Sequence, residues 1–244
     1  MVEKVKIVPK IITIHEGRVS FYKADIPRYR TNKQGQPIKT RPDGTPVKPR
    51  YGWTWLLDPS NAQAAATIKE IKEEAARQLD LFFNGRANWP KDNEVTGTKG
   101  ILQCFGEGNK LPKVYDGYKD MWFIKVSDTE RPIVGDRRGR SVQYVGNEGA
   151  GAWHYVDPKS GQTTEEVADP GQIPYAGSFC RGRISLYPYN NESAGINANA
   201  RSVQFLRPGA AFGGGGKRSA AEELEQMAGD AEPATAAASD DPWG

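Results

Sequence analysis

The stretch FCRGRISLYPYN, from Phe179 to Asn190, alternates between two kinds of side chain. Side chains of a β-strand point in turn to opposite faces of the sheet, so this alternation predicts a strand with two unlike faces. The first face is small and apolar, as a protein core requires: Cys180, Gly182, Ile184 and Leu186. The second face mixes guanidinium groups with rings: Phe179, Arg181, Arg183, Ser185, Tyr187 and Tyr189. The fold must therefore bury the first face and either expose or cover the second.

The second face of this stretch is open to two interpretations. A face that is merely solvated would more usually carry Lys, Glu, Thr and Ser. Arginines beside exposed rings suit a flexible single strand of nucleic acid, because fixed cations meet phosphates and flat rings stack on unpaired bases. The alternative is a strand buried on both faces, with the rings under a second layer and the arginines paired to carboxylates. The rest of the chain has to decide between the two.

A basic loop occupies residues 27–50, where seven basic residues accompany one acidic residue, Asp43. Prolines and glycines along the loop exclude a helix or a central strand, and the sequence PDGT predicts a turn. We expect a mobile loop that collects phosphates, and the alternative is a solvated, disordered insertion. The candidate phosphate-binding cations of the loop are Arg28, Arg30, Lys39, Arg41, Lys48 and Arg50.

Three aromatic side chains share one face of the strand predicted over residues 51–57, namely Tyr51, Trp53 and Trp55. A row of rings is either a stripe of the core or a platform on which bases stack. We assign Trp55 to the core. We predict that Tyr51 and Trp53, which lie beside the basic loop, are open for stacking, together with Tyr22 from the strand predicted over residues 18–23.

One amphipathic helix follows this strand. We expect Asp58 to cap its N-terminus with Pro59 in the first turn, and Asn84-Gly85 to end it. Its apolar stripe has helical spacing and comprises Ala64, Ile68, Ile71, Ala75, Leu79 and Phe82. We expect this helix to close one end of a barrel, because the remaining apolar stretches, such as residues 101–105 and 121–126, are short and strand-like.

The net charge of +3 conceals two unlike parts of the chain. Residues 217–244 hold two basic and seven acidic residues, a net charge of −5, so residues 1–216 carry +8. A basic body suits a polyanion, and an acidic tail suits a basic partner. The run GGGG after Phe212 predicts a flexible joint, and the low-complexity tail beyond it is expected to be disordered. The tail nevertheless ends with a candidate partner-binding motif formed by Asp240, Asp241 and Trp243.

Several classes of protein lack support in the sequence. No apolar run approaches the length of about 18 residues that spans a bilayer, and the first residues do not resemble an export signal. The two cysteines and the two histidines have no metal-binding spacing, so we expect no metal and no cofactor. A metal-dependent nuclease would need paired carboxylates, and the available ones lack such a spacing: Asp116, Asp120, Asp128 and Asp136. We therefore expect a binding protein without catalysis.

Three motifs together resemble a family of bacteriophage single-stranded DNA-binding proteins that was long catalogued only as a domain of unknown function. These motifs are YKDMWFIKVSDTERPIV, GRISLYPYN and GINANARSVQFLRPGAAFGG. The resemblance implies a mainly β protein with an OB-fold, a five-stranded Greek-key barrel, and one main helix. It implies a single-stranded DNA-binding domain over residues 1–215, followed by the joint and acidic tail over residues 216–244.

The resemblance also implies sequence-independent binding of single-stranded DNA during phage DNA replication or recombination, in the cytoplasm of the infected bacterium. The tail resembles those through which bacterial and phage single-stranded DNA-binding proteins recruit replication or recombination partners, although Gly244 follows the final aromatic residue here. We expect no membrane contact and leave self-association open. The alternatives are a strand-annealing recombination protein, a metal-dependent nuclease, or a virion assembly protein whose basic loop binds an acidic partner.

Overall fold

The computed structural model describes residues 7–212 except for 33, 42, 92–99, 116, 148–149 and 192. In this part of the chain, eleven strands form one continuous sheet beside a single α-helix. The strands are β1 (Ile11–Arg28), β2 (Arg50–Leu57), β3 (Leu102–Gln103), β4 (Phe105–Glu107), β5 (Trp122–Asp128), β6 (Ile133–Gly135), β7 (Ser141–Val145), β8 (Ala152–Val156), β9 (Thr163–Val167), β10 (Phe179–Asn190) and β11 (Ala194–Arg207). The helices are α1 (Ala62–Phe82) and the 3-10 turns η1 (Arg86–Asn88), η2 (Gly108–Lys110) and η3 (Pro170–Gln172).

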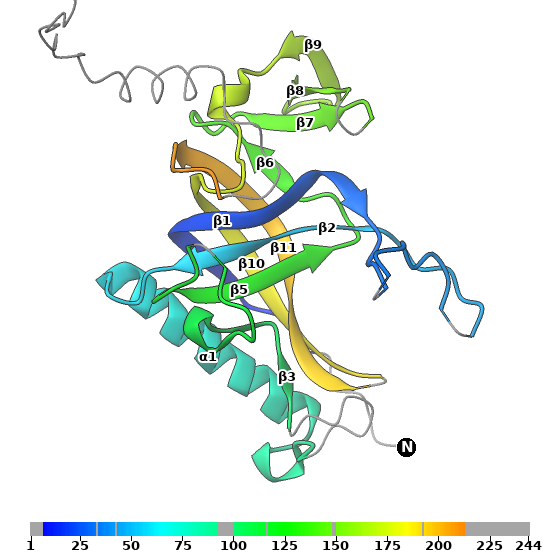
Figure 1. The fold of residues 1–244 in the computed structure, drawn as a ribbon, viewed down its shortest axis with the longest axis vertical. Coiled ribbons are helices and arrows are strands. Elements are labelled where there is room, and N and C mark those ends of the chain that lie inside the picture. Colours follow the sequence, from blue (N-terminus) through cyan, green and yellow to red (C-terminus); the bar gives the residue numbers. More distant parts are fainter. Residues whose placement is uncertain are drawn as a thin grey trace, which may run out of the picture. The chain divides into compact units, whose positions relative to one another are not determined.

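Five of the strands close into a barrel. β1 pairs with β2, β2 with β5, β10 with β11 and β1 with β10, all antiparallel. A parallel pairing of β5 with β11, at Val126 and Ala198, completes the ring. In chain order, the five barrel strands are β1, β2, β5, β10 and β11. Around the ring their order is β1, β2, β5, β11, β10, and β10 lies beside β1 (Figure 1). The OB-fold predicted from the sequence is confirmed.

The barrel interior follows from the alternation of side chains along its strands. Trp55 is fully buried at its centre, among the inward side chains of β1 and β10 such as Ile14 and Ile184. A Cβ atom at Gly182 would lie 2.8 Å from the indole of Trp55 and would also collide with the backbone of Ser202. Glycine at this position of β10 therefore makes room for the largest side chain of the core.

Helix α1 packs its apolar stripe against β1, β10 and β2, beside the barrel (Figure 1). Its N-cap is Asn61, whose Oδ1 accepts hydrogen bonds from the backbone N–H groups of Gln63 and Ala64 at 3.0 and 3.1 Å. Our prediction of Asp58 as the cap is wrong, because that carboxylate instead accepts from the N–H and hydroxyl of Ser60. The predicted end is confirmed at Asn84 and Gly85, which follow the helix with φ of 56° and 107°.

The buried face of α1 largely matches the predicted stripe. Ala64, Ile68, Ile71, Ala75 and Leu79 are buried, as predicted. Phe82 is 40 % exposed and so does not belong to the stripe. No described helix is long and apolar enough to cross a membrane.

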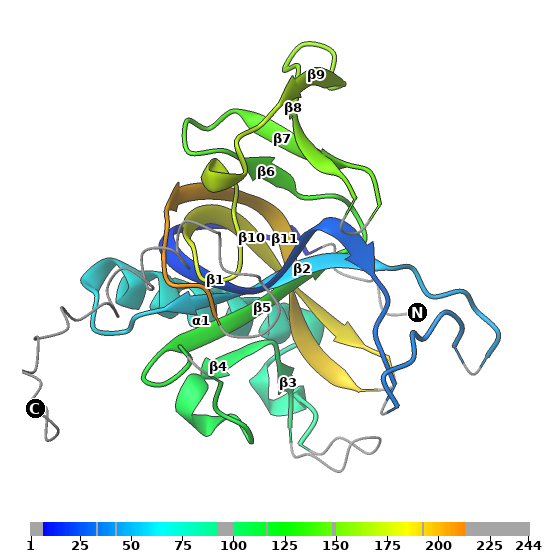
Figure 2. The same cartoon turned by 45° about the horizontal axis from the view of Figure 1, so that its top comes forward.

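A four-stranded extension continues the sheet beyond β11. β6 runs parallel to β11, with Ser202 opposite Ile133, and β7, β8 and β9 follow in antiparallel order (Figure 2). The turn from β6 to β7 is built around Asp136, which is fully buried and lies 3.0 Å from Nε of Arg140. Arg140 also pairs with Glu166 at 3.3 Å. Arg140 of the DRRGR sequence therefore has a structural role in this turn.

Candidate nucleic-acid interface

The outward face of β10 is presented as the sequence predicts. Cys180, Gly182, Ile184 and Leu186 are buried in the barrel, whereas Arg181 and Arg183 are exposed. β1 and β11 hold β10 on its two sides, which fixes the orientation of its side chains. Ser185 is the exception on the outward face, because it is fully buried beneath Arg201, whose Nε lies 3.3 Å from its Oγ.

The two arginines of this face have no carboxylate partner among the described residues. Neither Arg181 nor Arg183 forms an ion pair within this part of the chain. Nε of Arg181 donates to the side-chain oxygen of Gln204 at 2.8 Å, a neutral partner that positions the group without cancelling its charge. The alternative of a strand with its arginines locked to acids is therefore wrong for both residues.

A groove of about 770 Å³ runs along this face. Its floor is formed by β10 and β11, one wall by the start of β1, and the other wall by the segment from Asp128 to Ser141. Four arginines line the groove, namely Arg131, Arg181, Arg183 and Arg201. Of the described residues that line it, only Asp128 and Glu130 are acidic. The groove is therefore cationic along its floor.

The groove reaches the base of the basic loop, which connects β1 to β2. Nε of Arg131 donates to the hydroxyl of Tyr51 at 3.3 Å, and its guanidinium lies 5.6 Å from the centre of that ring. Beside it, Arg50 at the start of β2 donates to Oγ of Ser127 at 3.1 Å. Arg131 of the groove and Arg50 of the basic loop therefore lie near each other at the start of β2.

Rings flank the two exposed arginines along β10. Phe179 is half-buried between the guanidinium groups of Arg18 and Arg207, at 5.5 and 3.4 Å from its ring centre. Tyr187 and Tyr189 are half-buried toward the other end of the strand. We call Phe179, Arg181, Arg183, Tyr187 and Tyr189 the β10 strip, in which two cations lie between a ring on one side and two rings on the other.

Two of the rings predicted to stack on bases are buried, and a third, Tyr22, is partly buried against the core. Trp53 is 3 % exposed within the barrel core, and Tyr51 is 8 % exposed beneath Arg131. The hydroxyl of Tyr22 is buried, its ring centre lies 6.1 Å from that of Trp53, and burial raises its pKa well above the usual value. The prediction of accessible rings is wrong for Tyr51 and Trp53, because their strand turns these side chains into the barrel. Tyr22 packs against the core but is only partly buried, so stacking at this ring stays a prediction. The assignment of Trp55 to the core is confirmed.

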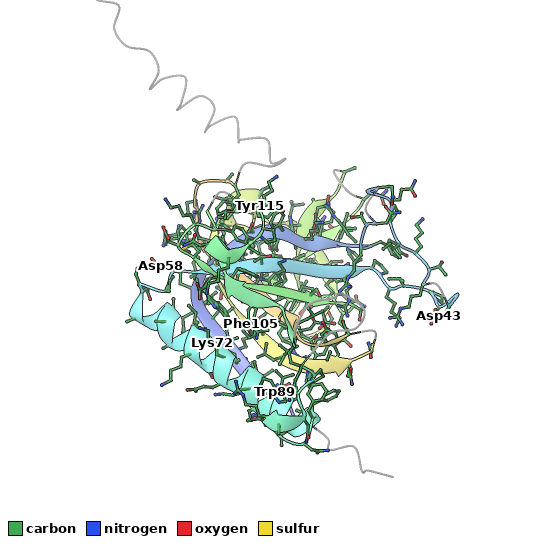
Figure 3. The ribbon with its side chains drawn as sticks, turned by 60° about the horizontal axis from the view of Figure 1, so that its bottom comes forward. Asp43, Asp58, Lys72, Trp89, Phe105 and Tyr115 are labelled. Carbon is green, nitrogen blue, oxygen red and sulfur yellow. The ribbon has the colours of Figure 1, made fainter. Side chains whose placement is uncertain are left out.

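An exposed ring that the sequence did not reveal lies on β1. Phe21 is 52 % exposed and has a φ of 49°, and the pairing of β1 with β2 is irregular between Ser20 and Lys23. Its ring meets that of Tyr115 edge to face at 5.3 Å (Tyr115 is labelled in Figure 3). Lys113 places its Nζ 5.5 Å from the centre of the Tyr115 ring. A left-handed angle is costly for a bulky residue and is often retained at functional sites.

The cations of the basic loop face solvent. Arg30, Lys39, Arg41 and Lys48 are exposed. Arg28 and Arg50, at the base of the loop, are half-buried, and Arg28 lies 3.9 Å from a carboxylate oxygen of Asp25. Figure 3 shows the loop extending away from the strands at the position of Asp43. The four exposed cations, Arg30, Lys39, Arg41 and Lys48, are therefore accessible to a polyanion.

Several carboxylates raised by the nuclease alternative have structural partners. Asp120 exchanges two hydrogen bonds of 2.9 Å with the side chain of Asn109, and Asp136 serves the β6–β7 turn. Within the described residues, no group of three metal-binding side chains occurs. Asp116 and the tail residues Asp240, Asp241 and Trp243 lie outside the described residues.

In OB-fold proteins, oligonucleotides bind across the second and third strands and beside two loops, one joining the first and second strands and one joining the fourth and fifth. Here the first of these loops is the basic loop, and the second follows Tyr187 and Tyr189 at the end of β10. The second and third barrel strands are β2 and β5, so the β10 strip, on the fourth, shares with that general binding face only its two loops. The barrel, the basic loop and the β10 strip together define an OB-fold protein whose surface suits an unpaired polyanionic strand.

Comparison with known proteins identifies the family. The family described as "Enterobacter phage Enc34, ssDNA-binding protein" matches residues 38–234, and the chain belongs to it. A curated relative, "Putative protein p50" of Acyrthosiphon pisum secondary endosymbiont phage 1, is 31% identical over 124 residues. That match covers 51% of this chain and 52% of the relative, so the chain spans about half the length of this relative.

Two solved structures share the fold. The single-stranded DNA-binding protein from bacteriophage Enc34 is similar with a TM-score of 0.52 and 18% identity, over 87% of this chain and 89% of that chain. The same phage protein in complex with ssDNA is similar with a TM-score of 0.55 and 18% identity, over 86% of this chain and 99% of that chain. The resemblance found in the sequence motifs is confirmed.

Proposed function

We propose that the chain binds single-stranded DNA without regard to sequence, through the β10 strip and the basic loop. The observation that carries this proposal is the exposure of Arg181 and Arg183 on one strand face, without an ion pair among the described residues and flanked by rings. Membership of the phage family and the likeness to a structure solved with ssDNA support it.

In this proposal, charge and stacking have separate sites. Phosphates bind to Arg181, Arg183 and the cations of the basic loop, which are Arg28, Arg30, Lys39, Arg41, Lys48 and Arg50. Bases stack on Phe179, Tyr187 and Tyr189, with each stacked base contributing about 1–3 kcal/mol. Neither interaction reads the edge of a base, so binding does not depend on sequence. No chemical step is involved.

The cellular part of the proposal concerns phage DNA metabolism. The chain covers single strands exposed during phage replication or recombination in the cytoplasm of the host, and the acidic tail recruits a basic partner protein through Asp240, Asp241 and Trp243. Support for the tail comes from its net charge of −5 and from a tryptophan placed beside two acids in a polar segment.

The binding site is tested by the salt dependence of affinity. Fluorescence anisotropy of labelled oligo-dT gives the slope of log affinity against log salt for the wild type and for an Arg181→Gln/Arg183→Gln variant. Each cation that no longer neutralises a phosphate lowers the magnitude of this slope by about 0.7 on single strands, so the variant's slope should be smaller by about 1.4.

The matched control removes the same charge elsewhere. Lys72→Gln/Lys159→Gln changes two exposed lysines, one on α1 and one in the β8–β9 turn. Lys72 lies well apart from the loop that carries Asp43 (Figure 3). The control should retain the wild-type slope. Equal slopes for the two double variants would refute binding at the β10 strip.

A further inference from the structure

The basic loop contains a tandem repeat. Residues 31–39 read TNKQGQPIK and residues 40–48 read TRPDGTPVK. Thr, Gly, Pro and Lys occupy the same four places in both, and Ile38 corresponds to Val47. We call residues 31–39 the first repeat and residues 40–48 the second repeat.

The repeat is also present in the backbone, where each hydrogen bond recurs nine residues later. In the first repeat, the N–H of Asn32 donates to the carbonyl of Gln36 at 2.9 Å. In the second repeat, the N–H of Arg41 donates to the carbonyl of Thr45, also at 2.9 Å. The bridge between Thr31 and Pro37 likewise recurs between Thr40 and Pro46. The two repeats therefore fold as the same compact turn.

A glycine makes each turn possible. Gly35 has φ of 79° and Gly44 has φ of 83°, in the left-handed region that glycine adopts without strain. Each donates its N–H, at 3.0 Å, to the carbonyl three residues earlier. The repeated Gly is thus required by the turn.

A third pair of bonds sets the spacing of the cations. The N–H of Ile38 donates to the carbonyl of Arg30 at 2.7 Å, and that of Val47 donates to Lys39 at 2.9 Å. Hydrogen-bonded residues on paired strands have Cα atoms about 5.5 Å apart, and the next Cα along the chain is about 3.8 Å further. The Cα atoms of Arg30 and Lys39 are therefore separated by at most about 9 Å, and the same holds for Lys39 and Lys48.

Without the turns, the same cations would be far apart. Nine residues of extended chain span about 30 Å. Because the residues between them form the turns, Arg30, Lys39 and Lys48 follow one another as equivalent positions of one row. At this spacing, neighbouring cations of the row can contact the backbone of the same single strand.

We propose that the basic loop is a modular phosphate-binding arm, in which each nine-residue repeat adds an equivalent increment of binding to single-stranded DNA. The proposal rests on the proposed function and extends it to how the loop was built and how it acts. Charge supports it, because each repeat contains two cations, although the second also contains one acid, Asp43. Among the described cations of the repeats, Lys39, Arg41 and Lys48, none forms an ion pair.

A series of loop lengths tests the proposal. One variant lacks residues 40–48, and another carries a further copy of TRPDGTPVK after Lys48. The deletion joins Lys39 to Pro49, which reproduces the native Lys48–Pro49 junction. Anisotropy of labelled oligo-dT is measured for one, two and three repeats from 50 to 200 mM salt, and thermal unfolding verifies that the barrel is intact.

We expect the slope of log affinity against log salt to change in equal steps. Removing Arg41 and Lys48 should lower its magnitude by about 1.4, and adding a repeat should raise it by a similar amount. The ratio of wild-type to deletion-variant affinity should therefore fall about sevenfold between 50 and 200 mM salt. A full-length Arg41→Gln/Lys48→Gln variant separates charge from length and should match the deletion.

The outcomes distinguish this proposal from the proposed function. If one, two and three repeats give the same slope while Arg181→Gln/Arg183→Gln still lowers it, the modular arm is refuted and binding at the β10 strip stands. A deletion that weakens binding when the Gln variant does not would also refute it, because length rather than charge would then matter. If the wild type fails to bind oligo-dT at low salt, the proposed function itself is wrong.

Discussion

At the scale of single residues, Phe21 is the side chain whose conformation is hardest to explain by stability alone. Its φ of 49° disfavours a bulky side chain, and 52 % of its surface faces solvent. We predict that its exposed ring, beside Tyr115 and Lys113, is a second place for a base to stack.

Replacement of Phe21 by Gly separates these effects. Relief of the left-handed angle is worth about 1–2 kcal/mol, and it offsets the flexibility of Gly and the absence of the edge-to-face interaction with Tyr115, about 1 kcal/mol each. We expect the free energy of unfolding, from urea denaturation, to change by less than about 1 kcal/mol. The free energy of binding to oligo-dT should become less favourable by about 1 kcal/mol or more, because one stacked base is lost. Unchanged affinity would exclude this ring from the interface.

The same residue shows where prediction from the sequence ends. Alternation correctly identified the two faces of β10 from Phe179 to Ile184, because the register shifts in its pairing with β11 leave the alternation of its own side chains intact. It failed on β1, where the irregularity after Ser20 exchanges the faces, so that Tyr22 turns inward and Phe21 outward. No residue type marks this irregularity in advance. The prediction for Trp53 failed for another reason. A row of aromatic residues has the same sequence pattern whether it fills a core or forms an exposed surface for base stacking.

A second prediction for a single residue concerns Asp136 and the pH dependence of the free energy of unfolding. Burial alone would raise the pKa of this carboxyl, but hydrogen bonds from the backbone and side chain of Arg140, and from Arg138, outweigh it and lower the pKa. A lowered folded-state pKa contributes stability above the unfolded-state value, and that contribution is lost as the pH falls through the folded-state value.

Asp136→Asn should therefore destabilise the chain at pH 7, by about 2 kcal/mol for a hydrogen-bonded charge. The difference from the wild type should shrink as the pH is lowered below about 4, near the ordinary Asp pKa. Urea denaturation at pH 7, 5 and 3 measures it. A difference that grows toward low pH would contradict the assignment.

At the scale of elements, α1 was predictable in its length and buried face but not in its first residue. Asp58 and Asn61 are both common caps, and only the structure shows that Asn61 bonds to the helix while Asp58 bonds to Ser60. The strands β7 to β9 were missed, because they have only five residues each, although they pair with their neighbours in sequence. The missed extension matters, since the segment leading to it and its first turn form a wall of the groove.

The cap assignment gives a test at this scale. Asn61→Ala should lower the free energy of unfolding by about 1 kcal/mol, because two N–H groups of the first turn lose their acceptor. Asp58→Ala is the matched control and should cost less, because its carboxylate accepts no bond from the helix. Chemical denaturation of both variants decides. A larger loss for Asp58→Ala would restore Asp58 as the cap.

At the scale of the whole molecule, the unequal distribution of charge is the feature that the sequence displayed most clearly. Removal of residues 217–244 raises the net charge from +3 to +8. Attraction to a polyanion depends on the total charge at low ionic strength. We expect this truncation to tighten binding of oligo-dT at low salt and to have less effect at high salt. Unchanged or weaker affinity at low salt would contradict the prediction.

The central claim is that an unpaired DNA strand follows the outward face of β10. The most direct measurement is a crystal structure of the chain with a short oligo-dT bound. The account predicts phosphate oxygens within hydrogen-bonding distance of the guanidinium groups of Arg181 and Arg183, with bases against Phe179 or Tyr187. A strand bound elsewhere on the barrel, with both arginines left in solvent, would contradict it.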